Sequence, residues 1–305
     1  MATEHNNLWE SDAEARVLEA RLNGFWNPDY FQHILVPKLN LKDGDKVLDV
    51  GAGNGALTLL LARYFPAVHF TGIDITPSMI ADADTQARRL GIQNAEFVEG
   101  NALQLQFEDN SFDAVVCQTL LMHLGDPEAA VNEMSRILKK GGRFMAAEYH
   151  ILSYEKPIET AQFIDDGDEA RISSYMQLII RGYRLSGQGN FKMGGRVPFL
   201  ATNAGLNISD IRINDRLPFA FPPYRKPSEK ISLTELQGWE ALIKDPAYRS
   251  WLAQAMIEGG GNEADADSFL KLLPSYTADI FKEESRFAFV WLLNPILLIT
   301  VAEKI

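Results

Sequence analysis

Short apolar segments alternate with amphipathic segments between residues 46 and 150, and this alternation limits the possible fold more than any other feature. Short apolar runs bounded by turn-forming residues are typical of buried strands, and longer amphipathic runs are typical of helices. Five strands are predicted at Lys46–Val50, Val68–Ile73, Ala95–Glu99, Ala114–Cys117 and Arg143–Glu148, with helices at Ala56–Phe65, Pro77–Leu90 and Pro127–Leu138. Strands that alternate with helices form parallel sheets, so we predict a doubly wound α/β fold.

Proline and glycine residues mark the predicted helix ends. Pro77 and Pro127 fall in first helical turns, where the missing N–H group costs nothing. Gly91 is predicted to end the second helix, and Gly141-Gly142 the third.

The remaining segments follow a different pattern. Residues 1–45 are predicted to be mainly helical. After Tyr149 the alternation lapses, and residues 151–195 and 214–285 combine charge, glycine and proline with scattered aromatics. We expect these two stretches to form helical cap insertions that cover a substrate. Further elements are predicted in the remainder: helices Ala161–Leu185 and Arg196–Ala204, and strands Asn207–Ile213 and Ile296–Ala302.

The predicted organisation is therefore an N-terminal helical segment (1–45), a ligand-binding core (46–150) and a region that carries the cap and the last sheet elements (151–305).

Composition excludes several classes of function. Apolar residues make up 46% and charged residues 23%, which is typical of a soluble globular protein. The net charge of −12 repels phosphate backbones, so no nucleic-acid partner is expected. The single cysteine, Cys117, excludes an internal disulfide and a cysteine-based zinc site, and no metal is predicted.

Location is inferred from segments that the chain lacks. No basic segment followed by an apolar one opens the sequence, so no signal peptide is predicted. The most apolar stretch, 287–302, is interrupted by Asn294-Pro295 and is shorter than the ~18 residues that a spanning helix needs. It is expected to form a buried strand with a turn. We expect a cytoplasmic protein with no membrane partner, whose oligomeric state stays open.

The glycine-rich segment Val47–Thr58 carries most of the functional information. A strand is predicted to end at Val50, and Gly51, Ala52 and Gly53 then allow the backbone to turn tightly and approach a ligand. The N–H groups at the following helix start face that ligand. The pattern alone is ambiguous, because it also fits the dinucleotide fingerprint G-x-G-x-x-G/A.

Asp49 and the length of the preceding segment argue against a dinucleotide. The Asp49 carboxylate, two residues before the first glycine, suits a cationic group such as the amino group of a methionine moiety, and it would repel a pyrophosphate. About 45 residues precede the first strand, whereas dinucleotide domains commonly begin with it.

Other strand ends supply the remaining candidate ligand contacts. Asp74 is placed to accept both hydroxyls of a ribose, Met79 to lie against a purine, and the Asn101 amide with a neighbouring N–H to read an adenine edge. The complete set of predicted cofactor-binding residues is Asp49, Gly51, Ala52, Gly53, Asp74, Ile75, Met79, Asn101, Ala102 and Gln118.

Five motifs in order resemble the class I S-adenosylmethionine-dependent methyltransferases, and within them the ubiquinone-biosynthesis (UbiE-like, methyltransferase type 11) small-molecule group. These motifs are Val47–Ala62, Gly72–Ile80, Phe107–Asp113, His123–Glu128 and Ser135–Gly142. The resemblance covers about residues 45–150 and implies a Rossmann-like seven-stranded sheet whose last strand is antiparallel. It also implies that S-adenosyl-L-methionine is the cofactor. Asn101 departs from the family, which often has an aspartate there.

Candidate catalytic residues follow from position. His123 lies just beyond the fourth strand and is either a general base or a packing residue. Tyr149 ends the fifth strand with Glu148 and His150 beside it, where an acceptor pocket is expected. We expect methyl transfer to an unidentified small molecule at O, N, C or S. The alternatives are an NAD(P)-dependent oxidoreductase, a SAM-binding protein without catalysis, and protein or RNA methylation, which a covered pocket and the acidic surface disfavour.

Overall fold

A computed structural model describes residues 26, 28–150, 158–160, 166–215, 219–220, 241–278, 289–291 and 296–305. The chain divides into two compact units. The sheet unit comprises residues 26–151, 187–215 and 296–305, and the second unit comprises residues 1–25, 152–186 and 216–295.

The sheet unit is built on seven strands in the order β3-β2-β1-β4-β5-β10-β7. The strands are β1 (Lys46–Val50), β2 (His69–Asp74), β3 (Ala95–Glu99), β4 (Phe112–Gln118), β5 (Leu138–Tyr149), β7 (Leu206–Ile213) and β10 (Leu297–Lys304). Strand β10 runs antiparallel to both its neighbours, and β1 to β5 are parallel. The predicted sheet is confirmed. The order reverses between β1 and β4, and open sheets bind ligands at the carboxyl ends of strands at such a point.

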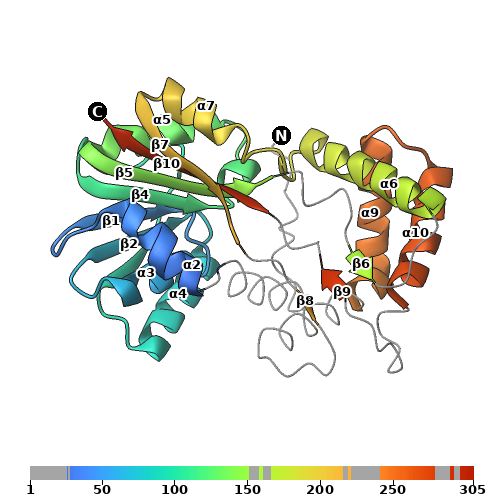
Figure 1. Cartoon of the computed structure of the whole chain (residues 1–305), viewed down its shortest axis with the longest axis horizontal. Coiled ribbons are helices and arrows are strands. Elements are labelled where there is room, and N and C mark those ends of the chain that lie inside the picture. The colour runs from blue at the N-terminus through green and yellow to red at the C-terminus, as the bar shows by residue number, and fades with distance from the viewer. Residues whose placement is uncertain are drawn as a thin grey trace. The chain divides into compact units, whose positions relative to one another are not determined.

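Helices cover both faces of this sheet (Figure 1). On one face lie α3 (Ala56–Tyr64), α4 (Pro77–Leu90) and the short N-terminal helical turns α2 (Pro28–Tyr30), η2 (Phe31–Leu35) and η3 (Val36–Leu39). On the other face lie α5 (Pro127–Ile137) and α7 (Val197–Asn203). The N-terminal turns are fixed by an ion pair between Lys38 and Asp210 of β7 at 2.9 Å. Most of the predicted segment 1–45 lies outside the described residues.

Helix ends agree with the sequence except in one place. Gly91 ends α4 in the left-handed conformation, as predicted, and its N–H bonds to the Ala87 and Arg88 carbonyls. The prediction that Gly141-Gly142 ends the third helix is wrong. Helix α5 ends at Ile137, and both glycines lie within β5. A Cβ on Gly142 would lie 2.8 Å from the Asp113 carbonyl oxygen, so glycine is needed where β5 approaches the start of its parallel neighbour β4.

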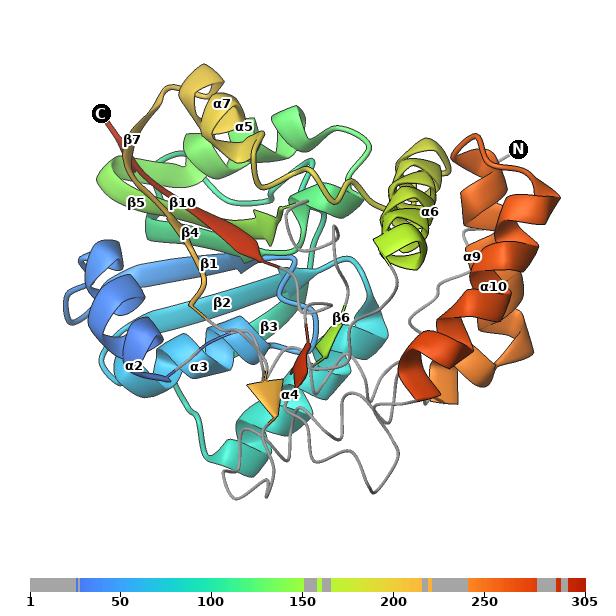
Figure 2. The same cartoon turned by 45° about the vertical axis from the view of Figure 1, so that its right-hand side comes forward.

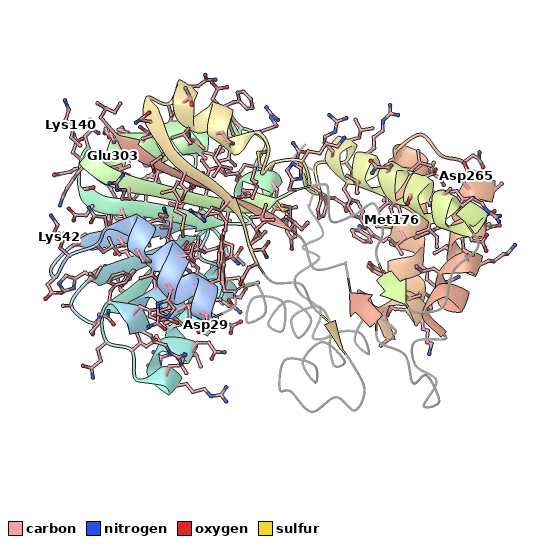
Figure 3. All side chains as sticks on the ribbon, in the orientation of Figure 1. Asp29, Lys42, Lys140, Met176, Asp265 and Glu303 are labelled. Carbon is pink, nitrogen blue, oxygen red and sulfur yellow. The ribbon has the colours of Figure 1, made fainter. Side chains whose placement is uncertain are left out.

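The last strand is tied to α5 by Lys304. Its Nζ donates to the main-chain oxygens of Ser135, Arg136 and Leu138 at 2.7, 3.1 and 2.7 Å. A side-chain cation that binds the final carbonyls of a helix satisfies acceptors that have no partner within it. Figure 3 shows Lys42, Lys140 and Glu303 at this same edge of the sheet, where the parallel strands begin. The carboxyl ends of those strands lie at the opposite edge.

The described residues of the second unit form three helices and a small sheet. The helices are α6 (Asp166–Leu185), α9 (Pro246–Glu258) and α10 (Glu263–Ala278), which pack against one another (Figure 2). Strands β6 (Ile158–Thr160), β9 (Phe289–Trp291) and β8 (Phe219–Ala220) are antiparallel. These strands are too short for an alternating pattern to predict. Helix α6 matches the predicted helix 161–185 from Asp166 onward. That this unit covers a substrate stays a prediction.

Helices α6 and α9 approach each other closely at two glycines. A Cβ on Gly182 would overlap the Ala255 carbonyl, and one on Gly259 would overlap the Leu178 carbonyl. Beside this contact the rings of Tyr183 and Trp251 stack with centroids 4.5 Å apart. Within the described part of the chain, no helix combines the length and apolarity that crossing a membrane requires.

Gly182→Ala is expected to destabilise the protein by about 1–3 kcal/mol, because the added methyl forces two packed helices apart. The free energy of unfolding in urea, followed by circular dichroism, measures the effect. Gly125→Ala is the control, since a Cβ there meets nothing within 4 Å. Equal stability of the two variants would contradict the close helix contact.

Candidate functional site

The glycine loop, residues 51–55, joins β1 to α3 at the carboxyl edge of the sheet. Gly51 and Gly53 have φ values of +72° and +54°, which favour glycine. A Cβ on Gly51 would lie 2.6 Å from Cδ1 of Leu120, whereas a Cβ on Gly53 would meet nothing within 4 Å. Ala52 between them donates its N–H to the Ile73 carbonyl at 2.8 Å. The loop is therefore packed on one side and open at Gly53.

Asp49 is almost completely buried near the end of β1. The Thr58 hydroxyl of α3 donates a hydrogen bond of 2.6 Å to its Oδ2. Burial raises the pKa of Asp49 to about 7, and the bond from Thr58 acts in the opposite direction. A carboxyl group with this pKa gains a proton easily near neutral pH and would ionise beside a cationic ligand.

Asp74 links the two loops that follow β1 and β2. Its Oδ2 accepts the Gly53 N–H and its Oδ1 accepts the Thr76 N–H, both at 2.9 Å. A carboxylate oxygen has more than one acceptor direction, so each retains the capacity for a further hydrogen bond. The arrangement holds both oxygens at a fixed orientation beside the open Gly53. Two adjacent hydroxyl groups fit such a carboxylate.

The end of β3 adjoins Asp74. The Gly100 N–H donates to the main-chain oxygen of Asp74 at 3.0 Å. Asn101 closes a turn in which its Oδ1 accepts the Leu103 N–H at 2.9 Å. The sequence predicted that this amide binds a ligand, but one acceptor direction of its Oδ1 is used by the Leu103 N–H within the loop. No described residue accepts a hydrogen bond from the Ala102 N–H.

Ile75 and Met79 are the apolar candidates beside Asp74. Ile75 is 67% exposed, although an isoleucine is normally buried. Met79 is half-buried in the first turn of α4. An exposed branched side chain next to an orienting carboxylate offers an apolar surface to a flat ligand.

Gln118 ends β4 and is bound by a residue that sequence reasoning missed. The Trp26 indole Nε1 donates to Oε1 of Gln118 at 2.9 Å, and both side chains are buried. No pattern in the sequence links positions so far apart. The next residue, Thr119, has φ +50°, which is rare for a β-branched residue. Such strain often occurs at functional sites.

Glu148 is fully buried at the end of β5 and faces the backbone of residues 120–122. Burial raises its pKa to about 8, while hydrogen bonds from the N–H groups of Leu121, Leu120 and Met122 act against this. Sequence reasoning expected Glu148 at the acceptor pocket together with Tyr149. Side chains alternate along a strand, so these two neighbours point to opposite faces of the sheet.

His123 and Tyr149 are both contacted by residues 187–195. His123 ends the short turn η4 (Leu121–His123), and although the residue is exposed, a Cβ on Gly189 would lie only 3.6 Å from its Nδ1. Loss of hydration lowers the pKa of His123, and a backbone hydrogen bond with Gln188 acts in the opposite direction. The Tyr149 ring is buried with its centroid 5.5 Å from that of Phe191.

Every predicted cofactor residue therefore follows or ends one of β1 to β4 at the carboxyl edge. Across the described ranges, no three His, Cys, Asp or Glu side chains are grouped so that they could hold a metal ion.

Comparison with known proteins gives the family. A methyltransferase domain model matches residues 41–180. An uncharacterized methyltransferase of Bacillus subtilis, YcgJ, is 36% identical over 105 residues, which are 34% of this chain and 41% of that protein. The demethylmenaquinone methyltransferase of Thermus thermophilus is 36% identical over 104 residues, which are 34% of this chain and 47% of that protein. Residues 41–180 of this chain are therefore similar to known methyltransferase domains.

Solved structures agree with this domain at the level of the fold. The YcgJ crystal structure matches 90% of this chain and 99% of its own, with a TM-score of 0.52 and 20% identity. The [4+2]-cyclase SpnF matches 96% of this chain and 93% of its own, with a TM-score of 0.55 and 18% identity. The aligned segment spans less than half the length of the two curated relatives. The family match confirms the resemblance, and the solved structures confirm the fold that it implied.

The raised pKa of Asp49 in the methyltransferase domain predicts how stability depends on pH. The folded protein keeps a proton on Asp49 up to about pH 7, whereas the unfolded chain loses it near the ordinary value of 3.8. The contribution of Asp49 to the free energy of unfolding is therefore fully present below pH 3.8, and it is lost as the pH rises to about 7. Asp49→Asn removes the ionisation. Its unfolding free energy minus that of the wild type should rise between pH 5 and pH 8, by up to about 2.6 kcal/mol.

Urea unfolding at several pH values measures this difference. Glu148 is present in both proteins, so its own titration cancels in the comparison. A difference that stays constant with pH would show that Asp49 is ionised throughout.

Proposed function

We propose that this protein transfers a methyl group from S-adenosyl-L-methionine to a small-molecule acceptor, at O, N, C or S. The observation that carries the proposal is the Asp74 carboxylate, whose two oxygens are oriented by backbone N–H groups from two loops. A carboxylate fixed in this way at a strand end fits the ribose diol of a nucleoside. The family match over residues 41–180 supports methyl transfer as the reaction.

The donor would lie along the carboxyl ends of β1 to β4. Its methionine part would lie against the open side of the glycine loop at Gly53, with the Asp49 carboxylate favouring the amino group. The adenine would cover the exposed Ile75 and accept a hydrogen bond from the Ala102 N–H, with Met79 near its face. Gln118 borders the same edge. This placement gives a role to most of the predicted cofactor residues, although not to Gly51, Ala52 or Asn101, and it leaves the region of Thr119 to His123 for the acceptor.

The donor supplies an activated methyl group on a sulfonium. The acceptor's lone pair forms the new bond to the methyl carbon as the carbon–sulfur bond breaks, and the bonding electrons stay on sulfur. The protein therefore contributes alignment and exclusion of water more than covalent chemistry. Gln118 and Glu148 are themselves buried at this edge of the sheet. A base is required only for an acceptor that must lose a proton.

His123 and Tyr149 are the candidates for contact with the acceptor. The lowered pKa of His123 keeps its imidazole neutral at neutral pH, so one ring nitrogen can accept a hydrogen bond or a proton. Tyr149 is held by Phe191 and its main-chain oxygen accepts the Gly194 N–H at 2.8 Å. We propose that both residues position the acceptor.

His123→Gln is expected to keep donor affinity and to lower turnover by less than about 100-fold, since a general base typically contributes 10²–10⁴-fold. The assay requires an acceptor, which a screen of phenols, amines and thiols with radiolabelled donor supplies. A loss of several orders of magnitude with unchanged donor affinity would make His123 the base instead.

Selective binding of S-adenosylhomocysteine tests the proposal. This product is expected to raise the melting temperature, because a ligand that binds only the native state stabilises it, whereas NAD and NADP should not. Stabilisation by NAD would favour an oxidoreductase. The [4+2]-cyclase with a similar fold shows that fold alone does not establish methyl transfer, so transfer of label to an acceptor completes the test.

Asp74→Ala locates the binding in this site. It should weaken S-adenosylhomocysteine binding by about 1.5–3 kcal/mol, the usual size for hydrogen bonds to a charged group. Asp113→Asn is the matched control. Asp113 also accepts a backbone N–H, that of Lys46 at 2.9 Å, but at the opposite edge of the sheet. Equal affinity of both variants, measured by calorimetry, would place the ligand elsewhere.

The net charge of −12 supports a further proposal, that the protein has no nucleic-acid partner. The single cysteine, which excludes an internal disulfide, supports the proposal that the protein acts in the reducing cytoplasm.

A further inference from the structure

Glu148 is a buried carboxyl group whose hydrogen-bond partners are all backbone N–H groups. Its Oε1 accepts the N–H groups of Leu120 and Leu121 at 2.8 and 2.7 Å, and its Oε2 accepts that of Met122 at 3.3 Å. None of the ion pairs among the described residues includes it. Three successive N–H groups at the start of a helical turn have no acceptor within the turn. Glu148 therefore caps η4 from a different strand.

The turn has its own backbone bonds, from the His123 N–H to the Leu120 carbonyl at 2.9 Å and from the Leu124 N–H to the Leu121 carbonyl at 3.3 Å, but its first N–H groups depend on Glu148. No side chain of η4 or its N-cap residue Leu120 caps it. The chain enters the turn through Thr119, at φ +50°, and the Thr119 N–H donates to the Ala147 carbonyl of β5 at 2.9 Å. A β-branched residue holds this backbone conformation only when its surroundings impose it. Strand β5 thus imposes the geometry twice, at Ala147 and at Glu148.

The turn contacts both parts of the proposed site. The Leu120 side chain packs directly on the glycine loop, since a Cβ on Gly51 would lie 2.6 Å from its Cδ1 and 3.0 Å from its Cγ. At the other end of the turn lies His123, and the Met122 carbonyl accepts the Asn190 N–H at 2.8 Å. Movement of the turn would release the donor loop and the acceptor side together.

We propose that Glu148 is a positioning residue for methyl transfer, which acts through the Leu120–Met122 backbone to hold the glycine loop and His123 in place. Glu148 itself contacts neither donor nor acceptor. The inference rests on the proposed function, because it assigns a role within that same site.

The role requires an acceptor and not a charge. Burial raises the pKa of Glu148 to about 8, so the neutral form is favoured at neutral pH. Its carbonyl oxygen still accepts the N–H groups of Leu120 and Leu121. Glu148→Gln keeps that oxygen, whereas Glu148→Met keeps the size of the side chain and replaces both oxygens by a thioether, which is only a weak acceptor. Glutamine is therefore the rescuing substitution.

The experiment compares the affinity of S-adenosylhomocysteine for four variants at a temperature where each is folded by circular dichroism. Glu148→Met should bind at least ~10-fold more weakly, since three buried N–H groups lose their partner. Glu148→Gln should stay within about 3-fold of the wild type, because it keeps one acceptor oxygen.

Leu120→Ala keeps Glu148 but removes the contact with Gly51, and it should weaken binding at least ~5-fold if the effect passes through that contact. Asp113→Asn should bind as the wild type does.

Two results would overturn the inference. The first is an affinity of Glu148→Met within about 3-fold of the wild type. The second is that Asp113→Asn weakens binding as much as Glu148→Met does, which would indicate a general loss of stability. If Glu148→Met does not fold, Leu120→Ala decides, and unchanged affinity in that variant contradicts the inference.

Failure of the proposed function is recognised separately. If the wild type does not bind S-adenosylhomocysteine, the proposed function fails, and amide hydrogen exchange then tests Glu148 without a ligand. Leu120→Ala should leave the amides of residues 120–122 protected and speed exchange in the glycine loop, while Glu148→Met should speed both. Unchanged exchange of the glycine loop in both variants would contradict the positioning role.

Discussion

Backbone N–H groups that strand pairing leaves unsatisfied at the carboxyl edge of the sheet determine how this fold is held together. Parallel strands require the chain to leave the sheet after each strand, and each departure exposes N–H groups that strand pairing no longer satisfies. Two carboxyl groups at strand ends accept them here: Asp74 for the loops after β1 and β2, and Glu148 for the turn after β4. The loops are consequently fixed before any ligand arrives.

This arrangement connects the stability of the fold to the chemistry of the site. Burial of carboxyl groups costs free energy, and at Asp49 and Glu148 this cost appears as pKa values raised to about 7 and about 8. Asp74 remains half-buried with acceptor capacity toward the open side of the loop. Methyl transfer depends mainly on alignment of the reactants, so it requires carboxyl groups that are held rigidly. Of these groups, Asp74 still has the capacity to bind a ligand.

Much of the fold followed from the sequence because its signals are local. The strands β1 and β3 and the helix α4 have the predicted bounds, since apolar periodicity, Pro77 and Gly91 all lie within the elements themselves. Gly141-Gly142 misled the prediction because glycine is typical of helix ends, whereas here a close approach of the strand to the Asp113 carbonyl requires it. The composition of a short segment does not distinguish these two reasons for a glycine.

The candidate site was predictable by position but not by contact. The glycine loop and Asp74 follow from a known motif at a strand end. Glu148 accepts the N–H of Leu121, which lies 27 residues earlier in the sequence, and Trp26 binds Gln118, which lies 92 residues later. Such partners are decided by tertiary packing and leave no pattern in one sequence. The Asn101 side chain shows the converse, because a local turn occupies an atom that the motif assigned to a ligand.

A crystal structure with S-adenosylhomocysteine would show which atoms the fixed loops present to the ligand. We expect both ribose hydroxyls on the Asp74 carboxylate, the adenine over Ile75, and the sulfur facing the turn from Thr119 to His123. A ligand bound in another part of the chain, or one whose ribose makes no contact with Asp74, would contradict this expectation.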